Sequence, residues 1–448
     1  MRVDAVRLDE NDHRTTSTGP RVLFVSHEAS RTGAPMVLLH FLRWLRDNTD
    51  LDFEILLLAG GPMVDEFRAV APTHQVEALG QGPFAYFEGG LAKAGFPGLG
   101  QKLKTVRARR SLSGLGSFDA LYLNSATSAF ALQAIPEIPP VVISHIHELD
   151  SAFAYWFPEP DRSTMLAATD WFVACAGAVG KNLVDNYGIP ADRVSTHYEF
   201  VAVPEVDAER AANLRAELGI PGRARLVGGS GVMNWRKAPD LFVQVAAAVC
   251  RAVPDDDVHF VWIGGPGDEP LPIDQDLAKL GIADRVHFVG EVVDPMDLFS
   301  QLDVFCLTSR EDPYPLVMLE AAGIGVPIVA FPNGGVVEFA GADDPGARRA
   351  VIVPYLDADA MGEAVARLLA DADERHAIAV RGQHRVRSEH TIPVGASALY
   401  ADLVGRIERG GAAEPGAEGG GGACAASDGV AVPRVSGPTP TALLGTVR

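Results

Sequence analysis

The sequence has little positive charge, no long apolar run and few cysteines. Its 448 residues contain 38 Lys and Arg against 58 Asp and Glu, which gives a formal net charge of −20. Because nucleic-acid binding depends on neutralising phosphates with cations, we expect no nucleic-acid partner. No run of about 18 apolar residues occurs, and the first twenty residues are polar, so neither a spanning helix nor a signal peptide is predicted. We expect a cytoplasmic protein, and a peripheral membrane contact stays compatible with this composition.

The spacing of the cysteines argues against a zinc-binding protein. Cys175, Cys250, Cys306 and Cys424 are widely separated and form no CxxC pair. This spacing favours reduced thiols and gives no zinc-binding pattern. We therefore expect no zinc site.

What the sequence does contain is a regular alternation of apolar strands and helices. At this length two domains are expected, because a single core stops growing earlier. The alternation is typical of parallel sheets covered by helices, and so predicts an α/β fold with two Rossmann-like units. The predicted strands of the first unit are 21–26, 53–58, 120–123, 141–144 and 171–174, and those of the second are 225–231, 259–263, 286–289, 302–307 and 327–331. Helices are predicted at 240–253, 357–372 and 396–409.

The most informative segment is 302–338. A polar loop follows its first strand and carries Glu311 and Asp312. Pro315 then opens a helix at a position where a missing N–H costs nothing. The amides of Leu316 and Val317 are therefore expected to be free and to favour an anion. Glu320 lies one turn further on, near enough to face the same ligand.

A second cluster of free amides is predicted at Asn333, Gly334 and Gly335, just after the next strand. Ligands of open parallel sheets bind at such carboxyl ends of strands. The segment thus combines carboxylates, amide clusters and a helix N-terminus. This combination indicates an anionic ligand rich in hydroxyl groups.

The segment closely resembles the donor site of family 4 glycosyltransferases, which have the GT-B fold. In that family an acid is followed after seven residues by Glu, then by a Pro-Val/Ile strand and a Gly-Gly turn. Asp312 and Glu320 keep this spacing, and residues 325–330 with Gly334 and Gly335 continue it. Two positions differ from the usual form. Asp312 replaces the commoner Glu, with Glu311 beside it, so either acid could face the sugar, and Pro315 stands where Gly is common.

The resemblance implies a GT-B architecture of two Rossmann-like domains facing across a cleft. The expected division is a disordered lead (1–20), an acceptor domain (21–203), a nucleotide-sugar domain (204–393), a helix crossing back to the first domain (394–409) and a disordered tail (410–448). It also implies a retaining, metal-independent transferase of the hexosyl type, which needs no cofactor because the nucleotide-sugar is a substrate. The donor would be a nucleotide-diphosphate sugar, and the acceptor a glycan, a lipid-linked molecule or a small molecule.

Site roles follow from the same resemblance. Glu320 would accept hydrogen bonds from the ribose, and Glu311 or Asp312 would contact the sugar hydroxyls. Lys237, Arg236 and the amides of Leu316 and Val317 would stabilise the departing diphosphate. The loop with Ser230 and Gly231 would bring backbone close to phosphate. Lys237 matches the family pattern, whereas Val232 occupies the usual Arg position, and the alternative is a solvated loop with ordinary surface cations.

Three further positions belong to this prediction. The amides of Gly33 and Ala34 are expected to contact donor phosphate, although a plain turn would also use Gly. The backbone around Val289 would face the base. His147 would lie near the reacting sugar, while a buried structural histidine or a metal pair with His145 are the alternatives.

Other functions remain open at the sequence level. A nucleotide-sugar epimerase or a phosphorylase would share the fold. A catalytically silent binding module is a third possibility, because Asp312 and Val232 are non-standard. A Rossmann dehydrogenase is a weaker candidate, since no GxGxxG opens either unit.

Overall fold

The computed structural model describes residues 19–76, 97–155, 157, 159, 161–203, 206, 215–267, 271–292, 294–341 and 347–410. The expected N-terminal lead and C-terminal tail lie outside the described residues, apart from residues 19, 20 and 410. Cys424 also lies outside them. The other three cysteines are free thiols.

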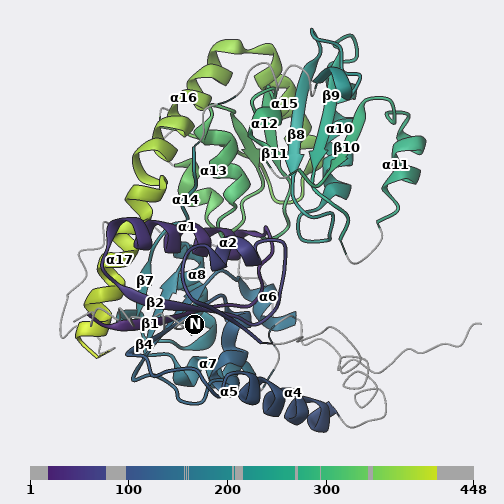
Figure 1. Cartoon of the computed structure of the whole chain (residues 1–448). Helices are drawn as coiled ribbons and strands as arrows, with labels where there is room; N and C mark the ends of the chain where they lie inside the picture. Colours follow the sequence, from purple (N-terminus) through teal and green to yellow (C-terminus); the bar gives the residue numbers. More distant parts are fainter. Residues whose placement is uncertain are drawn as a thin grey trace, which may run out of the picture. The chain divides into compact units, whose positions relative to one another are not determined.

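The first half of the chain forms a parallel sheet of seven strands in the order β3-β2-β1-β4-β5-β6-β7 (Figure 1). The central strands of this sheet are largely apolar and buried, as is typical of a parallel sheet with helices on both faces. The strands are β1 (Arg21–Ser26), β2 (Asp52–Leu57), β3 (Thr73–Gln75), β4 (Ala120–Asn124), β5 (Val141–Ile146), β6 (Trp171–Ala174) and β7 (Val194–Thr196). The helices and turns are α1 (Gly33–Asn48), α2 (Val64–Arg68), α4 (Pro97–Ser111), η1 (Ala126–Phe130), α5 (Ala131–Ala134), α6 (Asp150–Tyr155), α7 (Asp161–Ala168), α8 (Gly177–Tyr187) and η2 (Ala191–Arg193).

The second half forms a parallel sheet of six strands in the order β10-β9-β8-β11-β12-β13. Its strands are β8 (Arg225–Ser230), β9 (Val258–Ile263), β10 (Val286–Gly290), β11 (Val304–Leu307), β12 (Ile328–Ala330) and β13 (Val351–Ile352). The helices are α10 (Pro239–Ala252), α11 (Ile273–Leu280), α12 (Met296–Phe299), α13 (Leu316–Gly323), α14 (Val336–Ala340), α15 (Ala358–Ala370), α16 (Ala372–Glu389) and α17 (Ile392–Glu408). The predicted α/β class is confirmed.

The strand orders place one reversal point in each sheet. In the first sheet the chain runs outward from β1 through β2 and β3, and then returns to β4 on the other side of β1. The second sheet repeats this arrangement with β8 and β11 as the neighbouring strands. Ligands of doubly wound sheets bind at the carboxyl ends of strands beside such a reversal. The loops after β8 and β11 are therefore the first place to look for a site.

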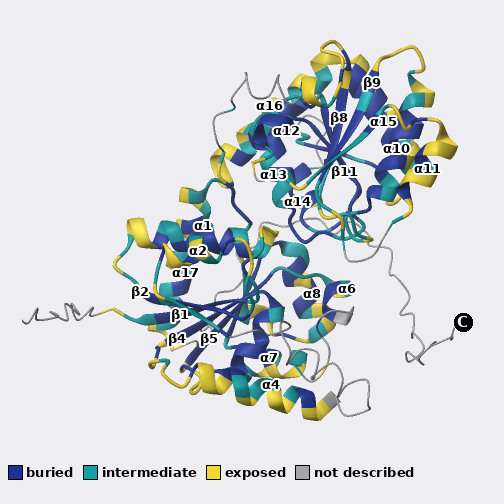
Figure 2. Cartoon of the chain, turned by 45° about the vertical axis from the view of Figure 1, so that its right-hand side comes forward, coloured by how far each residue is buried: buried dark blue, intermediate teal, exposed yellow. Residues whose placement is uncertain are grey.

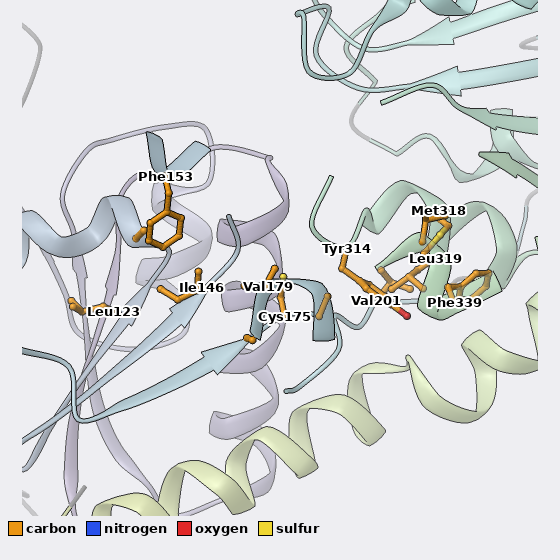
Figure 3. Packing of buried hydrophobic residues seen from close by; sticks show 14 of the residues in the cluster. Leu123, Ile146, Phe153, Cys175, Val179, Val201, Tyr314, Met318, Leu319 and Phe339 are labelled. Carbon is orange, nitrogen blue, oxygen red and sulfur yellow. The ribbon is translucent and has the colours of Figure 1, made fainter. Parts of the chain in front are cut away.

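The largest hydrophobic cluster includes residues of both halves. Phe153 and Val179 of the first half and Met318 and Phe339 of the second belong to it. Figure 3 shows Tyr314, Met318, Leu319 and Phe339 near Val201. Tyr314 belongs to the loop that precedes α13. Because these side chains are buried together, the core stabilises the position of that loop.

The last two helices differ from the sequence prediction. Only 396–409 was expected to be helical there, but α17 begins at Ile392, and the whole of α16 was missed. Buried residues of α17 join the cluster that contains α1 residues, since Leu399 and Leu403 lie with Phe41. The expected domain boundaries stay predictions. None of the described helices is long and apolar enough to cross a membrane.

Candidate functional site

Backbone hydrogen bonds hold the loops after β8 and β11 side by side. The Arg310 amide donates to the Arg236 carbonyl oxygen over 2.7 Å, and the Thr308 hydroxyl donates to the Lys237 carbonyl oxygen over 3.2 Å. Within the first loop, the Lys237 amide donates to the Asn234 side-chain oxygen over 2.9 Å. Such a side-chain turn fixes the local backbone. The two loops thus present their side chains toward each other at the reversal point of the second sheet.

An ion pair between these loops is the centre of the site. Lys237 Nζ lies 2.5 Å from Asp312 Oδ2, and the two side chains are only 14% and 6% exposed. Ser309 donates to the same carboxylate oxygen over 3.1 Å, and Arg236 lies 3.7 Å from the other one. Two cations are therefore gathered in one buried spot of an acidic protein.

Burial and charge act against each other on this pair. Burial lowers the pKa of Lys237, and Asp312 opposes that shift. Burial alone would raise the pKa of Asp312, but Lys237 and Arg236 outweigh it and hold the pKa below its usual value. The pair is thus best described as a buried ammonium–carboxylate contact. A polyanion that entered here would compete with Asp312 for both cations.

Gly231 makes room for Lys237 and has no free amide. A Cβ at this position would lie 2.8 Å from Lys237 Cγ, and φ is +146°. The Gly231 amide donates to the Ile263 carbonyl oxygen over 2.9 Å. The glycine therefore accommodates the lysine stem, and the expected close approach of this backbone to phosphate stays a prediction. The Ser230 hydroxyl is also hydrogen-bonded within the protein, since it donates to the Ile263 carbonyl oxygen over 2.8 Å.

The Gly334-Gly335 turn likewise packs against protein. A Cβ on Gly334 would lie 2.0 Å from the Asp312 carbonyl oxygen. The Gly335 amide donates to the Pro313 carbonyl oxygen over 2.7 Å, so the prediction that this amide is free is wrong. Asn333 adds a second link, as its side-chain nitrogen donates to the Ser309 carbonyl oxygen over 2.6 Å. These contacts of Asn333, Gly334 and Gly335 therefore stabilise the backbone of residues 309–313.

Replacing Gly334 by alanine should therefore unfold the site locally. Its φ is +47° and the new methyl would meet backbone, which cannot move aside cheaply. Gly281 is a matched control, because its φ is +70° but a Cβ there would meet open space. We expect Gly281→Ala to cost only about 1 kcal/mol. In thermal unfolding, Gly334→Ala should lower Tm clearly more than this control; equal shifts would contradict the packing role.

Two helix N-termini come together near this ion pair. Pro315 directly precedes α13 and gives no side-chain cap, and the first backbone bond runs from the Met318 amide to the Pro315 carbonyl oxygen over 3.1 Å. The amides of Leu316 and Val317 thus have no intrahelical acceptor. A Cβ on Gly33, the first residue of α1, would lie 3.9 Å from Leu316 Cδ1. The start of α1 thus packs against the Leu316 side chain at the start of α13, and phosphate contacts of the Gly33–Ala34 amides stay a prediction.

Glu320 lies one turn into α13 and is electrostatically coupled to Lys237. Burial and the negative charge of Asp294 raise the pKa of Glu320 to about 7, although Lys237 pulls it down. The carboxyl group is thus half-protonated near neutral pH. Sequence reasoning missed Asp294, because the loop after β10 carries no pattern that pairs it with a residue on α13.

The two neighbouring acids of the loop have different surroundings. Asp312 is occupied by Lys237, Arg236 and Ser309. The carboxylate of Glu311 instead accepts a hydrogen bond from the amide of Ser151, at the start of α6, over 3.2 Å. Glu311 is therefore the acid of the two that is not bound to the cations.

His147 is more enclosed than the sequence suggested. Its Nδ1 lies 2.7 Å from Glu199 Oε1 and its Nε2 lies 3.0 Å from Asn124 Oδ1, while the side chain is 6% exposed. Burial lowers the pKa of His147, but Glu199 outweighs it, so the pKa lies above its usual value. A charged ring donates to both partners. Both ring nitrogens are thus engaged by protein groups, and the expected place of His147 near the reacting sugar stays a prediction.

His145 lies beside His147 and is held by Tyr122. Its Nδ1 lies 2.7 Å from the Tyr122 hydroxyl, and burial holds its pKa well below the usual value. Among the described residues, the ligand atoms of His147, Cys175 and Glu199 do lie within 4.8 Å of one another. However, burial and the Glu199 charge raise the pKa of the Cys175 thiol well above its usual value. A metal ion could bind the Cys175 sulfur only after the thiol had lost its proton.

Val289 lies at an irregularity of β10. Phe288 pairs with Trp262 and Gly290 pairs with Ile263, so the ladder skips Val289. An unpaired residue of this kind leaves backbone groups available to a ligand. The arrangement is compatible with the predicted backbone contact to a base.

Comparisons with known proteins agree with this geometry. Residues 211–385 match the family model described as Glycosyl transferases group 1. A D-inositol 3-phosphate glycosyltransferase of Salinispora tropica is 30% identical over 255 residues, which are 52% of this chain and 51% of that protein. The lipopolysaccharide core biosynthesis mannosyltransferase LpsB of Rhizobium meliloti is 31% identical over 194 residues, 41% of this chain and 52% of that protein.

The fold is shared more widely than the sequence. The crystal structure of Anabaena Alr3699/HepE in complex with UDP and glucose superposes with a TM-score of 0.67 at 16% identity, covering 86% of this chain and all of that one. The chain spans about half the length of the curated relatives it matches. The predicted GT-B fold is confirmed by this superposition and by the two parallel sheets.

Proposed function

We propose that this chain, whose residues 211–385 match the family model of the glycosyl transferases group 1 and which has the GT-B fold, is a retaining glycosyltransferase. It moves a sugar from a nucleotide-diphosphate donor to an acceptor hydroxyl. The observation that carries this proposal is the buried Lys237–Asp312 pair, which lies between the loops at the reversal point of the second sheet. The amides of Leu316 and Val317, at the start of α13, follow Asp312 closely in the chain. Cations and amides together suit a diphosphate.

During the chemical step, negative charge develops on the departing diphosphate, beside these cations and amides. The bond between the sugar C1 and the diphosphate oxygen breaks, and the acceptor oxygen bonds to C1 from the same face. The acceptor proton passes to the departing phosphate oxygen, so no protein base is needed. Lys237, Arg236 and the amides of Leu316 and Val317 stabilise the departing diphosphate. One preorganised donor of this kind typically lowers the barrier by about 3–4 kcal/mol.

The two acids of the loop have separate roles in this proposal. Asp312 orients Lys237 in the empty site, and its carboxylate is displaced from the ammonium when the diphosphate arrives. Glu311, whose carboxylate is not bound to the cations, contacts the sugar hydroxyls. Glu320 accepts hydrogen bonds from the ribose, because a carboxylate suits a vicinal diol. His147 acts on the sugar side as a positioning residue, through its charge and through Asn124 and Glu199.

We further propose a hexosyl donor and a metal-independent reaction. The mannosyltransferase relative supports the hexosyl type. Lys237 and Arg236 supply positive charge at the place where a metal ion would otherwise bridge the phosphates. The inositol phosphate named for the Salinispora relative is the first acceptor to test.

A transfer assay tests this function directly. Nucleotide release and product formation would be followed with UDP- and GDP-linked hexoses, with and without acceptor, in buffer that contains EDTA. We expect release that depends on acceptor, and a product whose anomeric configuration by NMR equals that of the donor. Conversion of the donor sugar without acceptor would indicate an epimerase. Tight donor binding without any turnover would indicate a silent binding module.

A further inference from the structure

Among the residues that the structure describes, the two most exposed aromatic side chains lie at the carboxyl ends of strands of the second sheet. Trp235 follows β8 and is 57% exposed, and Tyr355 follows β13 and is 51% exposed. Figure 2 shows the strands β8 and β11 of this sheet as largely buried. Packing of the sheet therefore does not explain why two large rings stay in solvent at this end of it.

Both of these side chains contact Arg310. The guanidinium carbon of Arg310 lies 5.5 Å from the centre of the Trp235 ring, and the guanidinium donates to the Trp235 carbonyl oxygen over 2.8 Å. The Tyr355 hydroxyl donates to the Arg310 carbonyl oxygen over 3.0 Å. Asp240 holds the guanidinium through two hydrogen bonds of 3.0 and 2.6 Å. These contacts fix the rings in place before a ligand arrives, which lowers the entropy cost of binding.

The turn that carries Tyr355 also exposes a strained leucine. The Asp357 amide donates to the Pro354 carbonyl oxygen over 3.1 Å and closes this turn, in which Leu356 has a φ of +60° and is 40% exposed. Glycine or asparagine usually takes such a position, because other side chains are strained there. A leucine that is both strained and exposed does not stabilise the turn, and it points to a contact with a ligand.

Trp235, Tyr355 and Leu356, which we call the aromatic rim, adjoin the residues proposed to hold the donor. Trp235 directly precedes Arg236, and Arg310 directly precedes Glu311. The strand order β10-β9-β8-β11-β12-β13 puts β10 and β13 at opposite edges of the sheet. A base bound at β10 would therefore lie away from Tyr355, and the nucleotide would leave the rim free for another part of the reactants.

We propose, resting on the proposed transferase function, that the aromatic rim binds a sugar ring of a saccharide acceptor. The electron-rich faces of Trp235 and Tyr355 suit the C–H face of a pyranose ring. The Asp240 carboxylate, whose side chain is 36% exposed, can accept hydrogen bonds from the sugar hydroxyls. Because the rim is small and lies beside these charged groups, it suits a sugar better than an acyl chain.

Saturation-transfer difference NMR of the full chain without a donor tests this site. Linear tetrasaccharides of glucose, mannose, galactose and N-acetylglucosamine would be titrated one at a time. We expect at least one of them to bind, with saturation transferred mainly to the C–H protons of a single ring. Absence of binding for all of these saccharides would overturn the proposal.

Matched variants separate ring stacking from effects on folding. Trp235→Ser with Tyr355→Ser should weaken saccharide binding at least about tenfold, whereas phenylalanine at both positions keeps the rings and should bind within about threefold of wild type. Leu356→Gly relieves the strained φ, so it should weaken binding without lowering Tm. Val380→Ser is the control, because it removes an exposed valine from α16 and should bind like wild type. Equal binding by the serine and phenylalanine variants would contradict stacking on the rings.

Titration with nucleotide separates this inference from the proposed function. The double serine variant should keep the wild-type affinity for a nucleoside diphosphate, because the rim lies outside the proposed donor contacts. An equal loss of nucleotide and saccharide binding would overturn the inference, since the rings would then act on the donor loop. A wild-type dimer in sedimentation that the serine variant abolishes would also overturn it, because a second copy would cover the rim. Wild-type chain that binds saccharide but no nucleotide would support the rim and contradict the proposed function.

Discussion

Replacing Lys237 by alanine is expected to lower kcat/KM at least about tenfold. The ammonium group lies 2.5 Å from Asp312 in the loop that precedes α13, and a preorganised charge of this kind is worth up to about 3–4 kcal/mol of barrier. Steady-state kinetics with the donor identified in the transfer assay would measure the loss. Unchanged activity would contradict the electrostatic role of Lys237.

The buried pair requires a control for stability. Lys237→Ala leaves Asp312 buried with Arg236 and Ser309 only, and breaking such a pair costs roughly 3–5 kcal/mol. The double variant Lys237→Ala/Asp312→Asn removes both charges and should recover most of the lost Tm. It should not recover activity. If activity returned together with Tm, the loss in the single variant would be a folding effect.

An exposed lysine gives a second control. Lys181 on α8 also pairs with an aspartate, Asp185, but its side chain is 77% exposed. Surface pairs contribute little to stability, about 0–1 kcal/mol. Lys181→Ala should therefore leave both Tm and kcat/KM close to wild type. This comparison would show that the loss of activity comes from the position of Lys237 in the site and not from the removal of a lysine as such.

Replacing Glu320 by glutamine is expected to weaken nucleoside diphosphate binding by roughly tenfold to a hundredfold. The change removes a charge-assisted pair of hydrogen bonds to the ribose, for which about 1.5–3 kcal/mol is typical. Calorimetric titration of both proteins would measure it. Wild-type affinity in the glutamine variant would contradict the ribose contact.

The pKa of Glu320 adds a pH signature to this prediction. Because burial and Asp294 raise the pKa to about 7, the neutral form dominates below pH 7 and the carboxylate above it. If the carboxylate binds the ribose, wild-type affinity should rise as pH increases through 7. Glu320→Gln should lack this component, while it keeps the titration of the nucleotide itself. Asp294→Asn should shift the wild-type transition to lower pH.

The prediction of the main site residues rests on local patterns, and the structure places two of them, Lys237 and Asp312, in contact. Lys237, Asp312 and Glu320 follow recognisable strands and keep a spacing that resembles a known family. The free amides at Leu316 and Val317 followed from Pro315 alone, because a helix start leaves its first donors unsatisfied. These features depend on residues within one or two turns of each other.

Long-range partners could not be predicted in this way. The Gly335 amide is bound to the Pro313 carbonyl oxygen although α13 and β12 lie between them in the chain, and His147 is enclosed by Glu199, which is 52 residues away. No spacing rule connects such positions. Helix α16 was missed for a related reason, since its buried residues are few and small-residue positions such as Ala379 and Gly382 carry little apolar signal.

The most direct test of the donor site is a calorimetric titration of the full chain with UDP, GDP, ADP and NAD in buffer that contains EDTA. The account predicts tight binding of one nucleoside diphosphate, weakened by Glu320→Ala and by Lys237→Ala. The diphosphate that binds would also identify the base. Binding of none of the four ligands, or of NAD alone, would contradict the assignment of the loops after β8 and β11 as a nucleotide-sugar site.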